Sequence, residues 1–169
     1  MRGDSAGPGA IEIREADLGD SAQADALVEI IDSYARGPAG QDAPLSPDAR
    51  ANLAKGLREH PGAFALLAFD GPRAVGAAVC LVGFSTFAGR PLVNVHDLAV
   101  LPSHRARGIG GRLLAEVERR ACARGCCKIT LEVQDANEGA RRLYLRSGFG
   151  PEEAPPRFLT KRLEPGGAR

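Results

Sequence analysis

The spacing of apolar residues divides the first third of the chain into one short strand and two helices. Residues 11–13 alternate between apolar and polar, which is typical of a strand. After Asp20 or Ser21, either of which can cap a helix, apolar residues return every three or four positions. These residues are Ala26, Leu27, Ile30, Ile31 and Tyr34. Further on, Ser46-Pro47 combines a cap with proline in the first helical turn, and predicts a second helix as far as about Glu59.

The middle of the chain predicts three consecutive strands. Two apolar stretches, near 64–69 and 74–84, are separated by Asp70-Gly71-Pro72, a sequence typical of a tight turn. A longer turn over 85–91 then leads into a third strand, 92–100. The three strands follow one another with no helical segment between them.

The last third of the chain alternates helices with strands. An amphipathic helix over 112–124 is followed by a period-two strand over 128–133. A short helix is predicted from Asn137 to the sequence Ser147-Gly148-Phe149, and a last strand over 157–163. The apolar face of the first of these helices consists of Ile109, Leu113, Val117 and Ala121, flanked by Leu114.

These elements follow the order β-α-α-β-β-β-α-β-α-β, which predicts an α/β fold with one mixed sheet and helices on both faces. A chain of 169 residues can bury about 70% of its unfolded surface in a single core. We expect one domain over 11–163, with tails over 1–10 and 164–169, and we find no internal repeat.

The junction between strand 92–100 and the helix after it carries the strongest chemical signal. Arg105 and Arg107 precede the sequence Gly108-Ile109-Gly110-Gly111. The first turn of a helix has N–H groups without intrahelical partners and carries the positive end of the helix dipole. Glycines let a ligand approach this backbone, and the arginines add fixed positive charge. The junction is therefore predicted to bind a pyrophosphate group.

Several kinds of pyrophosphate site contain such a junction. A P-loop needs Gly-x-x-x-x-Gly-Lys-Ser/Thr, and no lysine or hydroxyl follows these glycines. The dinucleotide fingerprint Gly-x-Gly-x-x-Gly fits Gly108 and Gly110, but Leu113 stands at its third glycine. Glu132 lies near the distance of the usual ribose-binding acid, yet too little chain follows the motif for a doubly wound sheet. A glycine-rich turn that binds nothing is the remaining alternative.

Two separate stretches carry a family resemblance. Residues 105–110, Arg-Ala-Arg-Gly-Ile-Gly, follow the pattern Arg-x-x-Gly-x-Gly, and Asn137-(x)5-Leu143-Tyr144-(x)3-Gly148-Phe149 comes at the expected distance. The chain resembles the GCN5-related N-acetyltransferase (GNAT) superfamily over roughly residues 11–163. The resemblance implies acetyl-coenzyme A (acetyl-CoA) as the cofactor, with its pantetheine arm along a splayed strand. The implied cofactor-binding residues are Leu98, Ala99, Val100, Arg105, Ala106, Arg107, Gly108, Ile109, Gly110, Gly111, Asn137 and Tyr144.

Tyr144 and His96 are the predicted catalytic residues. The resemblance places Tyr144 beside the thioester sulfur, where its hydroxyl can hydrogen-bond the leaving thiolate. Histidine titrates near neutral pH, so His96 can accept a proton from the attacking amine. The period-two pattern predicts one strand face with Asn94, His96, Leu98 and Val100, and the other with Val95, Asp97 and Ala99.

Residues 84–100 are also similar, more weakly, to diamine and polyamine acetyltransferases. Those enzymes carry a Glu-Asp pair where this chain has His96-Asp97. No cysteine occupies the motif, so direct attack of the amine in a ternary complex is the expected mechanism. The primary amine of a small cationic molecule is the predicted acceptor. The alternatives are a protein or peptide amine, or a non-catalytic sensor that only binds acyl-CoA.

Charge is divided unevenly along the chain. Residues 1–48 carry a net charge of −7 and residues 100–146 a net charge of +5. The positive segment suits the phosphates of coenzyme A, and the acidic one would attract a cationic amine. The simpler explanation is that Asp25, Glu29 and Asp32 form the solvated face of an amphipathic helix.

Net charge, apolar runs and cysteine spacing argue against several other classes of protein. The overall net charge is only +1, which argues against an extended nucleic-acid surface. No apolar run approaches the roughly 20 residues of a membrane span, and no signal peptide is evident. Cys80, Cys122, Cys126 and Cys127 lack the spacing of a zinc site, so we expect no metal and reduced thiols in the cytoplasm. The sequence leaves a homodimer open.

Overall fold

One five-stranded sheet organises the protein. The computed structural model describes residues 10–150 and 159–163. The strands lie in the order β1-β2-β3-β4-β5, all antiparallel except for the parallel pair of β4 and β5. Their bounds are β1 Ile11–Glu15, β2 Ala63–Asp70, β3 Arg73–Ser85, β4 Arg90–Val100 and β5 Ile129–Leu131.

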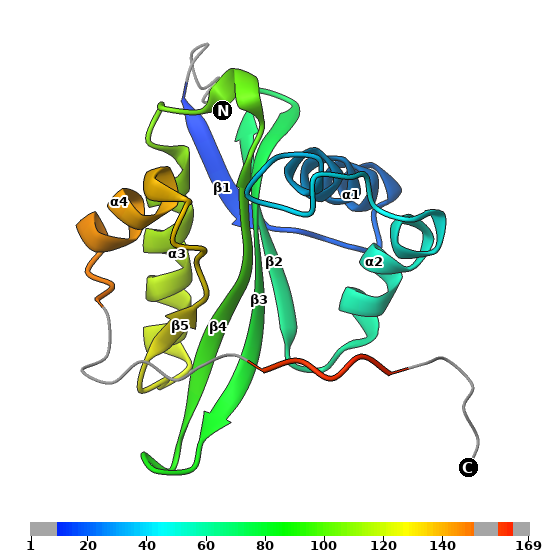
Figure 1. Ribbon diagram of the computed structural model, residues 1–169. Coiled ribbons are helices and arrows are strands. Elements are labelled where there is room, and N and C mark those ends of the chain that lie inside the picture. Colours follow the sequence, from blue (N-terminus) through cyan, green and yellow to red (C-terminus); the bar gives the residue numbers. More distant parts are fainter. Residues whose placement is uncertain (1–9, 151–158, 164–169) are drawn as a thin grey trace, which may run out of the picture.

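Helices cover both faces of this sheet. Helices α1 (Ser21–Ala35) and α2 (Pro47–Glu59) lie on one side, while α3 (Ile109–Ala123) and α4 (Glu138–Arg146) lie on the other (Figure 1). A short 3₁₀ helix, η1 (Pro102–His104), links β4 to α3. The predicted mixed α/β sheet with helices on both faces is confirmed.

Each face of the sheet has its own apolar core. On one face α3 buries the predicted stripe, including Ile109, Leu113 and Val117, against β2, β3 and β4. A Cβ atom at Gly76 would lie 3.2 Å from both the Ala99 oxygen and Ile109 Cγ2, so glycine lets α3 approach the strands closely. On the other face, Leu27 and neighbouring residues of α1 pack on β2, β3 and β4. The sheet is therefore held rigidly between two layers.

Local sequence signals account for the element boundaries. Asp20 caps α1 by accepting hydrogen bonds from the N–H groups of Ala22 and Gln23, and Ser46 caps α2 in the same way. Gly71 has φ +59° in the two-residue turn between β2 and β3. Proline cannot follow it with a positive φ, so the turn belongs to the type II′ class. Asn137 accepts from the Ala140 N–H and begins α4, as predicted.

Two predicted strands differ from the structure. The strand expected over 128–133 is only Ile129–Leu131, because pairing with β4 stops at Val95. The strand expected over 157–163 is wrong for 159–163, which forms no strand, and residues 157–158 lie outside the described part. Leu159 and Leu163 are 87% and 83% exposed, so no burial of an apolar face stabilises pairing there. The predicted tails, 1–10 and 164–169, lie outside the described residues apart from Ala10.

None of the helices in the described part of the chain is long and apolar enough to cross a membrane.

Candidate active site

An irregularity in β4 determines how its side chains are arranged. Val79 pairs with Asp97 but Cys80 pairs with Val95, so His96 is the extra residue of a β-bulge. A bulge shifts the alternation of side chains by one position. Val95 therefore shares the α3 face with Leu98 and Val100, while Ala99 packs toward α1. The predicted division of the strand into two faces is wrong at this point, because period two does not continue through a bulge.

The two ionisable residues at the bulge, His96 and Asp97, differ in their burial. His96 is exposed, whereas Asp97 is half-buried. Burial raises the pKa of the Asp97 carboxyl above its usual range, and the neighbouring His96 opposes that shift. Asp97 also helps raise the pKa of two tyrosine hydroxyls, Tyr34 at the end of α1 and Tyr144 on α4. The carboxylate therefore acts electrostatically on elements from both sides of the sheet, a role that the sequence did not reveal.

Tyr144 is held in place by packing. Its ring contacts the α3-side core and meets the Phe149 ring edge-on, with centroids 5.9 Å apart. Burial, with smaller effects from Tyr34 and Asp97, raises the pKa of its hydroxyl above 10. The hydroxyl therefore stays protonated at neutral pH and can donate a hydrogen bond.

The edge of β4 beside β5 is open over its last residues. The two strands pair only over Val93–Val95 and 129–131, and within the described residues nothing pairs with this edge beyond Val95. The Leu101 N–H donates to the Val75 oxygen of β3, so by alternation the main-chain groups of Leu98 and Val100 point away from β3. The structure thus presents the N–H groups of Leu98 and Val100 and the Leu98 oxygen, none of them paired with a described strand, along a splay between two parallel strands; the Val100 oxygen accepts from Arg105 Nε.

The open edge leads directly to the glycine-rich turn. Ala106 and Gly108 have φ values of +60° and +76°, which is unfavourable for alanine by about 1 kcal/mol. The first intrahelical bond runs from the Arg112 N–H to the Gly108 oxygen. Within the described residues, no acceptor is found for the N–H groups of 106–111. Six consecutive donors at the positive end of α3 can therefore bind an anion.

Both arginines of this turn contact other groups of the protein. Arg105 donates from Nε to the Val100 oxygen at 3.1 Å. Arg107 Nη1 lies 3.0 Å from Asp70 Oδ2, at the end of β2. His104 Nε2 lies 3.5 Å from the same oxygen. Sequence reasoning assigned Arg105 and Arg107 directly to the pyrophosphate and missed these contacts, because Asp70 is distant in the chain.

Gly110 and Gly111 also serve the packing of α4 against α3. A Cβ atom at Gly110 would lie 2.9 Å from Leu143 Cδ2, closer than real Cβ contacts allow. At Gly111 the nearest atom of Leu143 would be at 3.7 Å, an ordinary contact. Since α4 carries Tyr144 and begins at Asn137, these glycines place both predicted site residues next to the turn.

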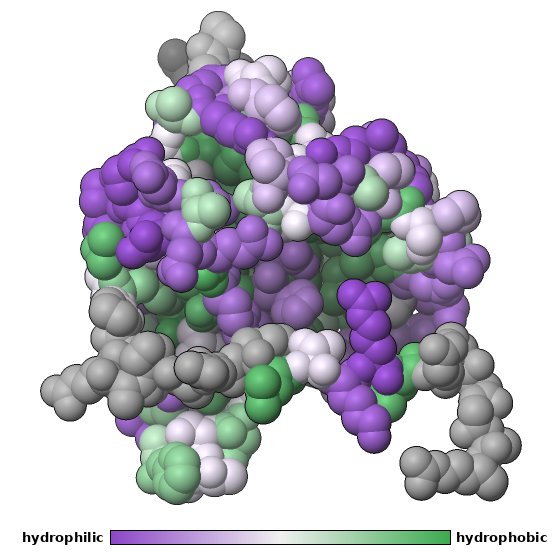
Figure 2. Space-filling view, in the orientation of Figure 1, coloured by the Kyte–Doolittle hydropathy of each residue, from purple (hydrophilic) through white to green (hydrophobic). Residues whose placement is uncertain are grey.

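Polar side chains occupy the other face of the splay, opposite α3. Asn94 pairs with Thr130 across β4 and β5, and its Nδ2 atom donates to Thr130 Oγ1 at 3.2 Å. The same amide lies 3.3 and 3.4 Å from the two carboxylate oxygens of Glu132. Because Leu131 is the last residue paired with Val95, Glu132 lies where the strands separate. The space-filling view shows a hollow between the two helical sides, with a floor of hydrophilic and hydrophobic side chains (Figure 2).

The acidic residues of α1 do not all face solvent. Asp32 is 5% exposed and accepts hydrogen bonds from Arg36 Nε and the Leu45 N–H, each at 2.8 Å. These contacts hold the pKa of its carboxyl below the usual range. Arg50 of α2 completes the cluster at 2.9 Å. The prediction of a solvated face is therefore wrong for Asp32, whose carboxylate binds the loop between α1 and α2 through the Leu45 N–H. Asp25 and Glu29 are exposed, as predicted.

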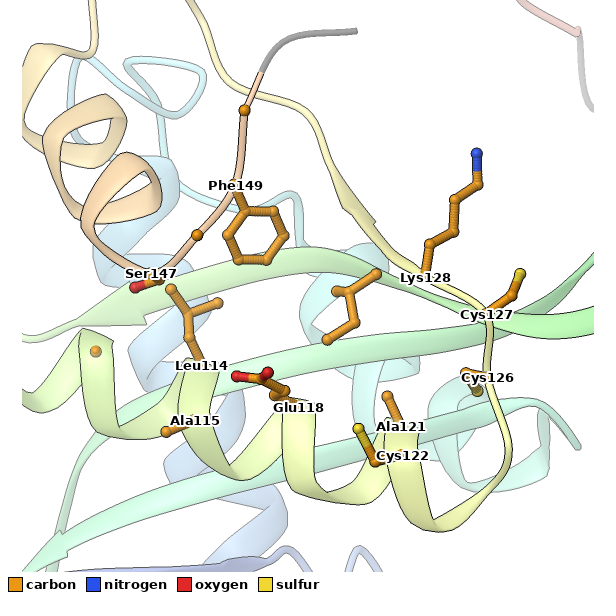
Figure 3. Close-up of a pocket in the computed structure, with 14 residues that line it drawn as sticks. Leu114, Ala115, Glu118, Ala121, Cys122, Cys126, Cys127, Lys128, Ser147 and Phe149 are labelled. Carbon is orange, nitrogen blue, oxygen red and sulfur yellow. The ribbon is translucent and has the colours of Figure 1, made fainter.

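A separate pocket of about 570 Å³ lies between α3, β5 and the residues after α4 (Figure 3). Phe149 extends toward it from above, and Cys122, Cys126 and Cys127 lie along its other end. All four cysteines are free thiols, and Cys80 is buried in the sheet. Of the predicted site residues only Gly111 lines this pocket, so it is distinct from the splay.

The chain is similar to known proteins in sequence and in fold. Residues 25–149 match the family described as the acetyltransferase (GNAT) family. The chain is 34% identical over 79 residues to thialysine N-epsilon-acetyltransferase of Bos taurus, covering 47% of this chain and 46% of that protein. It is 31% identical over 101 residues to the uncharacterized N-acetyltransferase YhfO of Bacillus subtilis, covering 60% and 67%. The match thus spans less than half of the bovine relative.

Solved structures show the same fold at low sequence identity. An aminoglycoside acetyltransferase from an uncultured soil metagenomic sample, in complex with sisomicin, superposes with a TM-score of 0.75 at 17% identity. The comparison covers 90% of this chain and 97% of that one. The family match covers most of the sheet, all of α3 and the α4 motif. This chain belongs to the acetyltransferase (GNAT) family.

Proposed function

We propose that the protein transfers the acetyl group of acetyl-CoA to the primary amine of a small cationic molecule. The observation that carries the proposal is two neighbouring stretches of main-chain groups left unpaired in the described part of the chain, one on the edge of β4 beyond Val95 and one formed by the N–H groups of 106–111 before α3. A carrier with an extended amide-containing arm and a diphosphate matches both stretches. The proposal rests equally on family membership.

The residues present fit such a carrier. The N–H groups of 106–111 are available for the diphosphate, because they have no acceptor within the described residues and a Cβ atom at Gly108 would meet nothing within 4 Å. Leu98 and Val100, flanking Ala99, would hydrogen-bond the pantetheine amides as an added strand does. Asn137 uses its Oδ1 atom to cap α4, which leaves its Nδ2 group for the carrier. When bound, acetyl-CoA supplies an activated acetyl thioester.

The acceptor must lose a proton before it can attack. An amine with a pKa of about 10.4 is neutral in roughly 1 part in 10³ at pH 7, a deficit of about 4.6 kcal/mol. In our proposal His96 accepts this proton directly or through water, and the Asp97 carboxylate stabilises the resulting positive charge. The electrostatic interaction of the two side chains supports this division of roles.

The leaving thiolate needs a hydrogen-bond donor. Tyr144 can supply it, because burial keeps its hydroxyl protonated. A thiolate with a pKa of about 8.5 is a weaker base than a tyrosinate, so full proton transfer to free thiolate is uphill by roughly 2 kcal/mol. Tyr144 therefore acts chiefly as a donor to sulfur, and yields its proton only as the amine loses its own.

A cationic acceptor is favoured by the charges around the splay. In our proposal the amine approaches from the face of the splay opposite α3, because α3 and its core cover the other face. On that approach lie the carboxylates of Asp97 and Glu132, the latter held by Asn94. Two carboxylates near the point of attack attract an ammonium group. Among the similar proteins, one is named for thialysine and another for aminoglycosides.

The test is an amine panel assayed for thiol release from acetyl-CoA. Diamines, aminoglycosides and lysine analogues should turn over, and neutral amines and peptides with free N-termini should turn over more slowly. Calorimetry with coenzyme A, beside NAD as a matched diphosphate, tests the carrier site separately. Binding of coenzyme A without turnover of any amine would make the protein an acyl-CoA sensor, and preference for NAD would refute the proposed site.

A further inference from the structure

The turn that lies at the positive end of α3 is tied to a distant part of the sheet by one carboxylate. Asp70 is the last residue of β2, and its partner across the sheet is Ile11 of β1. Its Oδ2 atom contacts Arg107 Nη1 at 3.0 Å and His104 Nε2 at 3.5 Å. Both partners belong to the segment 101–108, which connects β4 to α3. The β2–β3 turn and this segment lie at the same end of the sheet (Figure 1).

The three side chains differ in their exposure to solvent. The His104 side chain is 13% exposed, Asp70 26% and Arg107 42%. His104 also contacts the Ser103 hydroxyl through Nδ1 at 2.8 Å, so the ring is held on both sides. A partly enclosed ion pair is less weakened by salt than one on an open surface. The contacts can therefore hold the segment in place in the absence of any ligand.

The segment needs such support because its backbone is strained. Ala106, which lies between Arg105 and Arg107, has φ +60°, a conformation that alanine rarely adopts. Released from its contacts, the chain would relax toward ordinary φ values. The N–H groups of 106–111 would then lose the arrangement that they have in the structure, and binding a diphosphate would require ordering them again.

We infer that Asp70 is a positioning residue for the acetyl-CoA site. Its carboxylate contacts Arg107 and His104, and these contacts keep the diphosphate-binding turn in its binding conformation before the ligand binds. The inference rests on the proposed function of that turn. It also opposes a simpler electrostatic expectation, under which removing a negative charge near a diphosphate would tighten binding.

Two substitutions separate position from charge. Asp70→Ala removes both the oxygen acceptor and the charge, whereas Asp70→Asn keeps an oxygen for Arg107 and removes only the charge. We expect Asp70→Ala to raise the calorimetric Kd for coenzyme A about three- to fivefold, within the range of one partly exposed ion pair. Asp70→Asn should restore most of the affinity. Glu59→Ala is the matched control, because it removes an ion pair of equal length, 3.0 Å to Lys55, on α2.

Hydrogen exchange of the ligand-free protein gives a second measurement. Peptides covering 101–111 should exchange faster in Asp70→Ala than in the wild type, while peptides from α2 remain unchanged. In turnover assays the KM for acetyl-CoA should rise with kcat preserved, since Asp70 does not touch the reacting atoms. In an Arg107→Ala background, Asp70→Ala should have a smaller effect on the Kd.

Each of these measurements can refute the proposed role of Asp70. If Asp70→Ala binds coenzyme A as tightly as the wild type or more tightly, with unchanged exchange over 101–111, Asp70 does not position the turn. If Asp70→Asn binds as poorly as Asp70→Ala, the charge rather than the held position is what matters, and the inference is again wrong. If the wild type itself binds no coenzyme A, the proposed function fails, and this inference fails with it.

Discussion

Replacing Tyr144 by phenylalanine isolates one atom of the proposed mechanism. The ring is held by the α3-side core and by its edge-on contact with Phe149, and these contacts do not depend on the hydroxyl. The hydroxyl itself remains protonated, since its pKa lies above 10. Tyr144→Phe should therefore leave the fold and coenzyme A binding intact, and remove only the hydrogen bond to the departing sulfur.

The size of the effect follows from the kind of bond that is lost. A hydrogen bond to a charged group contributes about 1.5–3 kcal/mol. Each 1.36 kcal/mol in the barrier changes the rate tenfold, so kcat should fall by about 10- to 150-fold. If the bond forms mainly as charge develops on sulfur, kcat and kcat/KM should fall together while the Kd for coenzyme A changes less than twofold.

The assay needs one correction that the structure suggests. Thiol release is read with a disulfide reagent, and exposed Cys122 will react with it, so an enzyme-only blank must be subtracted. The pH profile adds a further check, because burial raises the pKa of Tyr144 and the wild type should therefore lose no activity through this hydroxyl near neutral pH. Retention of kcat within twofold in Tyr144→Phe would show that this hydroxyl does not assist the leaving group.

Three further outcomes test the packing and the titration of the fold. In urea unfolding, Gly110→Ala should be less stable than Gly111→Ala by about 1 kcal/mol, because only the former displaces Leu143 from its rotamer; equal stability would contradict the close contact. Two arginines lower the pKa of Glu116 from 4.5 to about 2, so its contribution to stability is complete above pH 4.5 and is lost as pH falls toward 2. Glu116→Gln should accordingly lower stability at pH 7 but not at pH 2. Burial raises the pKa of Cys80 to about 12, so peptide mapping after iodoacetamide treatment at pH 8 should find this thiol unmodified until the protein unfolds.

Local signals were enough to predict most elements of the fold. Caps at Asp20, Ser46 and Asn137 mark helix starts because each supplies an oxygen to the first turn, and all three do so in the structure. The helix predicted to end at 124 ends at Ala123 in the structure, and Gly125 follows it with φ +69°. Such signals depend on neighbours in the chain and are therefore visible in the sequence.

Features that depend on long-range contacts could not be predicted in this way. The length of β5 is set by where β4 ceases to pair with it, and nothing in 128–133 marks that point. The contact between Asp70 and Arg107 joins residues 37 positions apart. Leu143 explains the need for glycine at 110 as much as any ligand does, and that need appears only once α3 and α4 are packed together.

The bulge at His96 is both a feature that the sequence did not predict and a part of the proposed site. A regular strand would place Asp97 and His96 on opposite faces and keep β4 paired along its length. The extra residue instead interrupts the register at the point where β5 departs, and it leaves a half-buried carboxylate beside an exposed imidazole. Bulges cost ladder hydrogen bonds, and they recur beside active sites because they redirect side chains. In this protein the irregularity lies next to the strand edge proposed to bind the carrier and includes the residues proposed to receive the proton of the acceptor and to stabilise the resulting charge. A substitution that restored regular pairing through His96 would therefore impair carrier binding and proton transfer together, whereas His96→Gln, which leaves the backbone alone, would impair only the second.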